Sequence, residues 1–202
     1  MSLYNSAIII FQKNAQKGRV KTRLAATIGD EEALKVYRLL TEYTHQVCLE
    51  LDCPKFLYFS DFITDSESRD HYELRVQDGK DLGERMKNAF EALFEAGYEK
   101  ILILGTDCAE LDATILKKAF KDLKNEEVVI GPARDGGYYL LGMSKFVPEL
   151  FEDMPWSTKD VAPETMKRLN ELSIPFTTLP TLSDVDNEAD WERVKGKFVF
   201  QG

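Results

Sequence analysis

The sequence between residues 128 and 142 reads VVIGPARDGGYYLLG: two apolar runs with a short, polar, glycine-rich connection between them. β-Branched residues form the first run, and the second begins directly after Gly136 and Gly137. Two strands joined by a tight bend are the direct interpretation. Because the connection is too short for a crossover helix, we expect the strand at 138–143 to run antiparallel or to lie across the sheet. Taken alone, the stretch fits a plain hairpin with a polar tip equally well.

Working outward from this stretch, apolar runs alternate with segments of helical periodicity. Strands are expected at 6–11, 55–60, 72–77, 100–104 and 175–179. Helices are expected from Asp30 as N-cap to the break at Pro54, from Gly83 to Gly97, after Asp112, across 160–172 with Thr158 as a cap, and after Asn187. This alternation predicts an α/β fold, a three-layer sandwich around a mostly parallel mixed sheet, as one domain over residues 1–202.

Composition narrows the class of protein. Hydrophobic residues make up 44% and charged residues 30%, the formal net charge is −9, and no apolar run approaches the ~20 residues of a membrane helix. The net negative charge argues against general nucleic-acid binding. The start of the chain lacks the pattern of a secretory signal, and its three cysteines form no CxxC pair, so we expect a reduced protein in the cytoplasm. Oligomeric state is left open.

Two aspartates follow the ends of apolar strands. Asp107 comes after the run at 101–104 and the pair Gly105-Thr106, and Asp135 follows the strand at 128–130. In open α/β sheets ligands bind at the carboxyl ends of strands, so both carboxylates are candidate site residues. Gly136 and Gly137 can adopt positive φ and let a ligand approach the backbone, which makes them candidate substrate-binding residues.

The segment from Gln12 to Leu24 is basic. It contains Lys13, Lys17, Arg19, Lys21 and Arg23 and no acidic residue, although the protein as a whole is acidic. A solvated basic loop is the simple interpretation, but the position after the first strand favours an anion-binding loop. The segment lacks the glycines of a Walker loop, so side chains such as Lys21 and Arg23 are expected to hold phosphates.

Taken together, six motifs resemble a known family. They are KTRL at 21–24, DLGERM at 81–86, GTD at 105–107, GPARDGGYYL at 131–140, WST at 156–158 and DVD at 184–186. In this order they resemble the bacterial GT-A-type glycosyltransferases of unknown specificity, within the nucleotide-diphospho-sugar transferase superfamily. Two departures stand out: Cys108-Ala109 replaces the family's Ser-Pro after the aspartate, and the loop after the first strand lacks the usual prolines and arginine.

The resemblance implies a metal-dependent transferase with a nucleotide-activated donor and an unknown acceptor. Mg²⁺ or Mn²⁺ would stabilise the diphosphate leaving group. Asp107 and Asp186 are the expected metal ligands, Asp184 being the less favoured of its pair, and Asp135 is the expected catalytic carboxylate that orients or deprotonates an acceptor hydroxyl. The remaining predicted residues are Phe11, Lys21, Arg23, Leu82, Gly83 and Thr106 for the nucleotide, and Gly136, Gly137, Trp156, Ser157 and Thr158 for the substrate.

Three functions remain open from the sequence. The first is glycosyl transfer from a nucleotide diphosphate sugar. The second is nucleotidyl transfer from a nucleoside triphosphate to a phosphorylated small molecule, because KTRL is also similar to a segment of phospholactate guanylyltransferases; the absence of a G-x-G-T-R loop argues against it. The third is nucleotide binding without turnover, because a fold does not determine a function.

Overall fold

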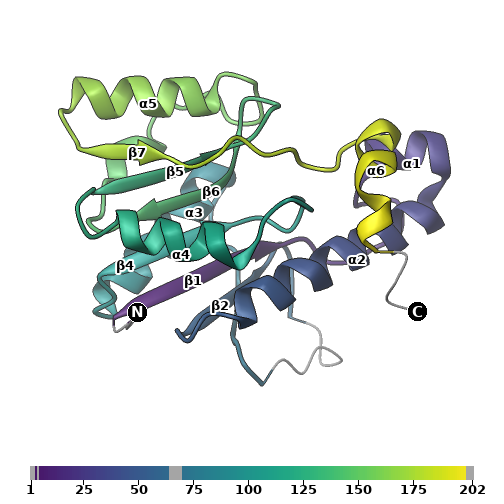
Figure 1. The fold of residues 1–202 in the computed structure, drawn as a ribbon, viewed down its shortest axis with the longest axis horizontal. Helices are drawn as coiled ribbons and strands as arrows, with labels where there is room; N and C mark the ends of the chain where they lie inside the picture. Colours follow the sequence, from purple (N-terminus) through teal and green to yellow (C-terminus); the bar gives the residue numbers. More distant parts are fainter. Residues whose placement is uncertain (1–2, 4, 64–69, 199–202) are drawn as a thin grey trace.

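One mixed sheet forms the centre of the molecule (Figure 1). The computed structural model describes Leu3 and residues 5–63 and 70–198. In this part of the chain seven strands follow the order β3-β2-β1-β4-β6-β5-β7. Their bounds are β1 Ser6–Gln12, β2 Lys55–Phe59, β3 Glu73–Val76, β4 Lys100–Leu104, β5 Val128–Pro132, β6 Tyr138–Met143 and β7 Phe176–Thr178. β6 pairs antiparallel with both β4 and β5, and the other pairings are parallel, so the expected antiparallel strand at 138–143 is confirmed.

The central strands are apolar at almost every position because helices cover both faces of the sheet. Along β1, Ile8 and Ile10 pack into one core and Ala7 and Ile9 into the other, all of them inaccessible to solvent. β4 alternates in the same way between the two cores. Successive side chains of a strand point to opposite faces of the sheet. Because both faces are buried here, every position is hydrophobic, and the strand appears in the sequence as an unbroken hydrophobic run.

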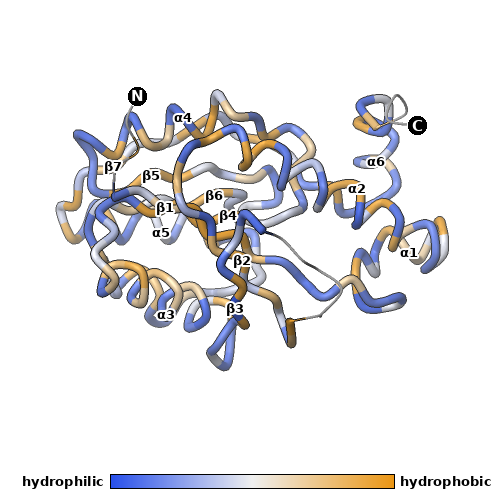
Figure 2. The backbone as a smooth tube through the Cα atoms, turned by 90° about the horizontal axis from the view of Figure 1, so that it is seen from below, coloured by the Kyte–Doolittle hydropathy of each residue, from blue (hydrophilic) through white to orange (hydrophobic). Residues whose placement is uncertain are grey.

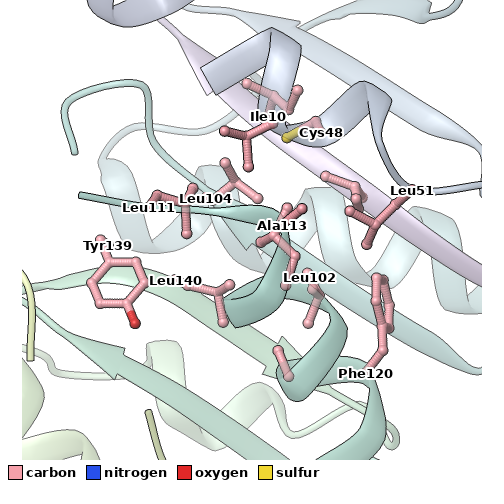
Figure 3. Packing of buried hydrophobic residues seen from close by; sticks show 14 of the residues in the cluster. Ile10, Cys48, Leu51, Leu102, Leu104, Leu111, Ala113, Phe120, Tyr139 and Leu140 are labelled. Atoms are coloured by element: carbon pink, nitrogen blue, oxygen red, sulfur yellow. The ribbon is translucent and has the colours of Figure 1, made fainter. Parts of the chain in front are cut away.

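Helices form a layer on each face (Figures 1 and 2). The helices are α1 Thr22–Ile28, α2 Asp30–Leu49, α3 Leu82–Glu95, α4 Ala113–Asp122, α5 Val161–Glu171 and α6 Glu188–Val194, with short 3₁₀ turns at Pro148–Phe151 and Lys195–Lys197. α2 and α4 bury Cys48 and Phe120 on one face (Figure 3), and α3 and α5 bury Phe90 and Leu169 on the other. The predicted three-layer α/β sandwich with a mostly parallel mixed sheet is confirmed.

A third, smaller cluster lies to one side of the sandwich, where α1 and α6 meet the start of α2 (Figure 1). Leu24, Val36 and Val185 are buried there, from three segments far apart in the sequence. The basic segment was expected to be a loop as far as Leu24, which is wrong over its last three residues, because α1 begins at Thr22. A helix of seven residues has little stability of its own, so burial of Leu24 in this cluster stabilises α1.

Two of the four predicted N-caps, Asp112 and Asn187, are present. The Asp112 carboxylate accepts a hydrogen bond from the Ile115 amide at 2.8 Å, and Asn187 forms a capping box with Asp190. Asp30 is the first helical residue and Gly29 the cap, a difference of one position. Thr158 does not cap α5: Asp160 is the N-cap, and its amide donates to the Thr158 hydroxyl at 3.3 Å instead.

None of the helices in the described residues has the length and apolar character needed to cross a membrane. The cysteines are free thiols, and burial raises the pKa of Cys48 and of Cys108 to about 12. Such thiols stay protonated at neutral pH, so they have little nucleophilic or ligand character.

Candidate functional site

A cleft of about 530 Å³ opens at the carboxyl ends of β1, β4 and β5, a volume within the usual range for small-molecule sites. The chain changes direction across the sheet between β1 and β4, which is where open α/β sheets bind ligands. The predicted site residues that line the cleft are Lys21, Arg23, Leu82, Asp107, Asp135, Gly137, Trp156, Ser157, Thr158 and Asp186. The cleft is also lined by Lys13, Val20, Thr22, Tyr37, Tyr138, Lys159, Val161 and Asp184.

Four carboxylates gather in this cleft. Asp107 follows β4, Asp135 follows β5, and Asp184 and Asp186 lie on the segment before α6. Burial, and then the charges of Asp107 and Asp135, raise the pKa of Asp184 to about 7, while the nearby Lys21 acts in the opposite direction. Asp184 was predicted only as the less favoured metal ligand of its pair, and its buried environment was not predicted. No local signal could have shown it, because the burial comes from remote segments.

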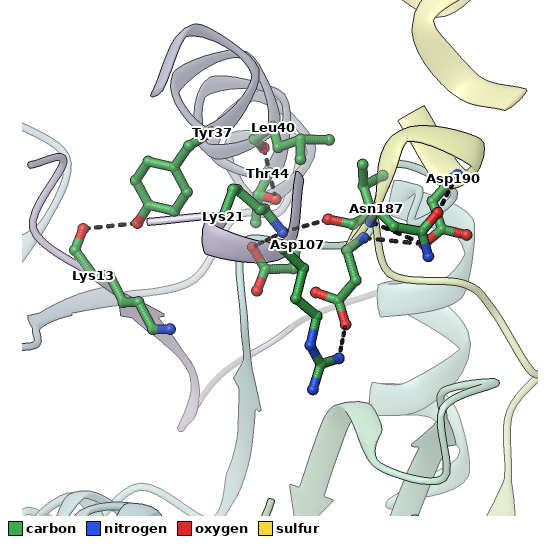
Figure 4. Close-up of polar contacts among 11 residues, drawn as sticks. Lys13, Lys21, Tyr37, Leu40, Thr44, Asp107, Asn187 and Asp190 are labelled. Carbon is green, nitrogen blue, oxygen red and sulfur yellow. Dashed lines mark hydrogen bonds and ion pairs between the residues drawn. The ribbon is translucent and has the colours of Figure 1, made fainter. Parts of the chain in front are cut away.

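The two predicted phosphate-binding cations occupy different environments. The Lys21 side chain is only 4% exposed, and its ammonium lies 2.6 Å from Asp107 Oδ1 (Figure 4). The same ammonium donates to the Val185 carbonyl at 2.7 Å. Arg23 is 80% exposed, and its Nη1 lies 3.4 Å from Asp186 Oδ2. Arg23 is therefore free to reach a ligand in the cleft, whereas Lys21 is already engaged with the protein.

α2 contributes Tyr37 to the cleft. In the sequence this residue appeared only as part of the apolar face of the helix. The Tyr37 hydroxyl donates to the Lys13 carbonyl at 2.7 Å (Figure 4) and also pairs with the side chain of Thr106. Burial raises the pKa of Tyr37 to about 12. Thr106 itself is buried and does not line the cleft. These contacts hold the basic segment against the end of β4, and Tyr37 remains a neutral hydrogen-bonding group.

The turn between β5 and β6 is shaped by its glycines. Gly136 has φ +93°, which confirms the expected positive φ, and a Cβ there would lie 1.9 Å from the Lys159 carbonyl oxygen. The Ala162 amide donates to the Gly136 carbonyl at 2.9 Å. Gly136 thus faces the backbone at the start of α5 and does not line the cleft. Gly137 does, and its amide donates to Asp135 Oδ1 at 2.9 Å, which orients that carboxylate.

Trp156 forms one wall of the cleft by packing on the first turn of α3. A Cβ on Gly83 would lie 2.2 Å from the indole nitrogen, so the absence of a side chain at Gly83 is what admits the ring. The ring also stacks on that of Phe151, with 6.4 Å between the ring centroids. Gly83 lies beneath the ring and away from the cleft, and Leu82 beside it is exposed. Phe11 also lies outside the cleft and packs against Tyr58, 5.6 Å between ring centroids.

The donor set suits a hard divalent cation only in part. Aspartate oxygens are the ligands that Mg²⁺ and Mn²⁺ prefer, and several converge here. Among the described residues, however, no three His, Cys, Asp or Glu side chains come close enough to form a complete metal centre. The residues therefore fit a cation that takes one or two protein ligands and completes its shell from water and a bound ligand, as Mg²⁺ commonly does.

Comparison with known proteins identifies the family. Residues 34–158 match the family described as uncharacterised proteins conserved in bacteria, DUF2064. A crystal structure from Desulfovibrio desulfuricans G20, described as that of a "putative nucleotide-diphospho-sugar transferase", is 30% identical with a TM-score of 0.90, over 98% of this chain and 89% of its own. No protein of curated function matches the sequence.

More distant structures share the fold alone. CMP:2-keto-3-deoxy-manno-octonic acid synthetase, solved with CTP, has 12% identity and a TM-score of 0.56 over 96% of this chain and 98% of its own. The inositol-1-phosphate CTP transferase from T. maritima has 16% identity and a TM-score of 0.57 over 91% and 90%. The family match and the 30% identical relative agree with the resemblance seen in the motifs. The chain therefore belongs to the DUF2064 family, and it is a transferase of the nucleotide-diphospho-sugar transferase type.

Proposed function

We propose that this protein transfers a glycosyl group from a nucleotide diphosphate sugar to a small acceptor, with the help of a divalent cation. The observation that carries the proposal is the meeting of four aspartates with Lys21 and Arg23 in one cleft at the carboxyl ends of β1, β4 and β5. A ligand that carries both phosphates and hydroxyl groups matches such a mixed lining, because cations bind phosphate oxygens and carboxylates bind hydroxyls or a metal.

In this proposal Asp107 and Asp186 hold the cation, and Asp184 lines the same cleft. When bound, the cation would supply electrostatic stabilisation of the departing diphosphate. Without it, four aspartates face the cations Lys13, Lys21, Arg23 and Lys159, so the cleft has little excess positive charge to offset the charge of a nucleotide diphosphate. Arg23 is exposed and can donate to the phosphates.

The acceptor side is assigned to the turn after β5. Asp135 is exposed in the cleft, and only one of its oxygens accepts the Gly137 amide in the described structure. The other oxygen can accept a hydrogen bond from an acceptor hydroxyl and, as general base, its proton. Trp156 lines the cleft beside Ser157 and Thr158, and the part of its ring that reaches the cleft can pack against a sugar ring.

Nucleotidyl transfer is the second candidate. It is favoured by the motif Lys21-Thr22-Arg23-Leu24, whose side chains line the cleft except for the buried Leu24. Both reactions need phosphate-binding cations and a divalent metal, so the cleft lining alone does not choose between them. The donor distinguishes the two reactions, because glycosyl transfer uses a nucleotide diphosphate sugar and nucleotidyl transfer uses a nucleoside triphosphate.

A thermal-shift panel of nucleoside triphosphates, nucleotide diphosphate sugars and free nucleotides, with Mn²⁺ or with EDTA, tests the proposal. A ligand that binds the native state raises the midpoint by mass action. We expect diphosphate sugars to raise it most, and only with the metal. Preference for a triphosphate would favour nucleotidyl transfer, and no shift across the panel would contradict both.

The first substitution to test is Asp107→Asn. Asparagine keeps a side-chain acceptor for the turn but loses the charge that a hard cation needs. We expect the variant to remain folded and to lose Mn²⁺-dependent nucleotide binding and turnover. Asp112→Asn is the matched control, because it makes the same change at a helix cap of α4, away from the cleft. Unchanged Mn²⁺-dependent affinity in Asp107→Asn, measured by calorimetry, would contradict the metal assignment.

A further inference from the structure

Lys21 has a side-chain environment that phosphate binding does not explain. Its ammonium is buried in the protein, 2.6 Å from Asp107 Oδ1 and 2.7 Å from the Val185 carbonyl oxygen (Figure 4). A phosphate-binding lysine normally extends into solvent toward its ligand. Here the ammonium lies against the same carboxylate that is the first candidate for the metal.

The backbone at Lys21 supports a dedicated role for this contact. Lys21 is the N-cap of α1 in the left-handed conformation, φ 49° and ψ 43°, and its side chain makes no capping hydrogen bond. Non-glycine residues rarely adopt this conformation, which persists only where surrounding contacts hold it. Three residues contact one another in a ring. The Lys21 ammonium contacts the Asp107 carboxylate and the Val185 carbonyl, and the Val185 amide donates to the Asp107 carbonyl at 2.9 Å.

We propose that Lys21 is a built-in counter-ion of Asp107 that keeps divalent cations out of the nucleotide-free cleft, so that the metal enters together with the nucleotide. The inference rests on the proposed cation-assisted function. An ammonium at Asp107 Oδ1 neutralises this carboxylate and repels a second cation at its other oxygen. Asp107 is 43% exposed, so it is reachable from the cleft but already has a partner.

The phosphates of a nucleotide would change this balance. An ammonium has three donors, and two of those of Lys21 are used in the described structure. The third can meet a phosphate oxygen, and the negative phosphates offset the repulsion between the ammonium and the metal. Lys21 is then a positioning residue that makes cation binding depend on the nucleotide.

The test uses Mn²⁺ alone, titrated into the full chain and followed by the electron paramagnetic resonance signal of the free ion. In the wild type we expect binding weaker than about 1 mM. In Lys21→Met we expect affinity at least about tenfold tighter, because the repelling charge beside Asp107 is gone. Lys13→Met is the matched control: it removes the same charge from the same cleft, and Lys13 contacts Tyr37 only through its backbone carbonyl.

A second variant at the same position controls for misfolding of Lys21→Met. Lys21→Gln keeps an amide that can donate to Val185 or Asp107 without the charge, and circular dichroism checks the folding of each variant. The double variant Lys21→Met/Asp107→Asn should bind Mn²⁺ no more tightly than the wild type, which would show that the higher affinity of Lys21→Met depends on the Asp107 carboxylate. An equal gain in Lys13→Met, no gain in either Lys21 variant, or tight Mn²⁺ binding by the wild type would overturn the inference.

The outcome separates this inference from the proposed function. A gain in Lys21→Met together with silence of the nucleotide panel would support the counter-ion role and contradict the proposed function. Mn²⁺-dependent nucleotide binding without a gain in Lys21→Met or Lys21→Gln would overturn the counter-ion role and leave the proposed function intact.

Discussion

Asp184 lies among three other carboxylates, and its pKa is raised to about 7 by burial and then by the charges of Asp107 and Asp135. An unfolded chain releases this proton near pH 4. The folded state holds it up to about pH 7, so ionisation of Asp184 makes the folded state progressively less stable as pH rises between these values and costs the full penalty above pH 7.

Asp184→Asn should therefore stabilise the metal-free protein at pH 8 and leave it unchanged near pH 4. We expect a gain of about 1–3 kcal/mol in the free energy of unfolding at pH 8, seen as a rise of several degrees in the melting temperature. The measurement is thermal or urea unfolding in EDTA, with Asp112→Asn as the control for loss of a negative charge elsewhere. An equal effect of Asp184→Asn at both pH values would contradict the raised pKa.

At the scale of elements, the turn between β5 and β6 and the start of α5 are packed backbone to backbone. Gly136 carries this contact through its positive φ and through the absence of a Cβ beside the Lys159 carbonyl. Because Gly137 and Lys159 both line the cleft, the packing of these two segments sets the width of the cleft at this point.

Gly136→Ala and Gly97→Ala make a matched pair of substitutions. Gly97 has a similar φ of +91°, but a Cβ there would meet nothing within 4 Å. Alanine at Gly97 should cost only the left-handed backbone penalty, about 1–2 kcal/mol. Alanine at Gly136 should cost more, because the segment at Lys159 must also move, and it should weaken ligand binding. Urea unfolding and calorimetry check both expectations, and equal losses in the two variants would argue against the close packing.

For the molecule as a whole, stability should be distributed unevenly. β1 and β4 lie at the centre of the sheet between two large cores, whereas α1 and α6 rest on the smaller third cluster. Local opening needs least energy where few apolar contacts are lost. The cleft lies between these regions, since Asp107 follows β4 while Lys21 and Asp186 flank α1 and α6.

Hydrogen exchange should show this gradient directly. We expect the slowest amide exchange in β1 and β4 and faster exchange in α1 and α6. A nucleotide bound with Mn²⁺ should slow exchange in α1 and α6 specifically, because it would tie Arg23 and Asp186 to the end of β4. The control is Asp107→Asn with the same ligand, in which that extra protection should be absent. Uniform slowing over the whole chain would contradict a site assembled from these segments.

Much of the fold follows from local patterns in the sequence. The unbroken run at Ile8–Ile10 predicts a strand buried on both faces, and the short glycine connection before Tyr138 predicts the reversed strand, because each depends only on neighbouring residues. The aspartates after β4 and β5 could be placed at the site for the same reason: strand ends in an α/β sheet share one edge. The acidic and basic motifs of the cleft were thus visible before the structure.

Tertiary structure alone decided how those residues act on one another. The contact between Lys21 and Val185 joins positions 164 residues apart, and no local pattern indicates that Lys21 would neutralise Asp107 rather than face solvent. The burial of Asp184 and the short helix α1 likewise depend on packing at the third cluster. Sequence determines which groups reach the edge of the sheet, because that depends on local periodicity. Their pairing, burial and charge depend on the distances that the folded chain sets between remote segments.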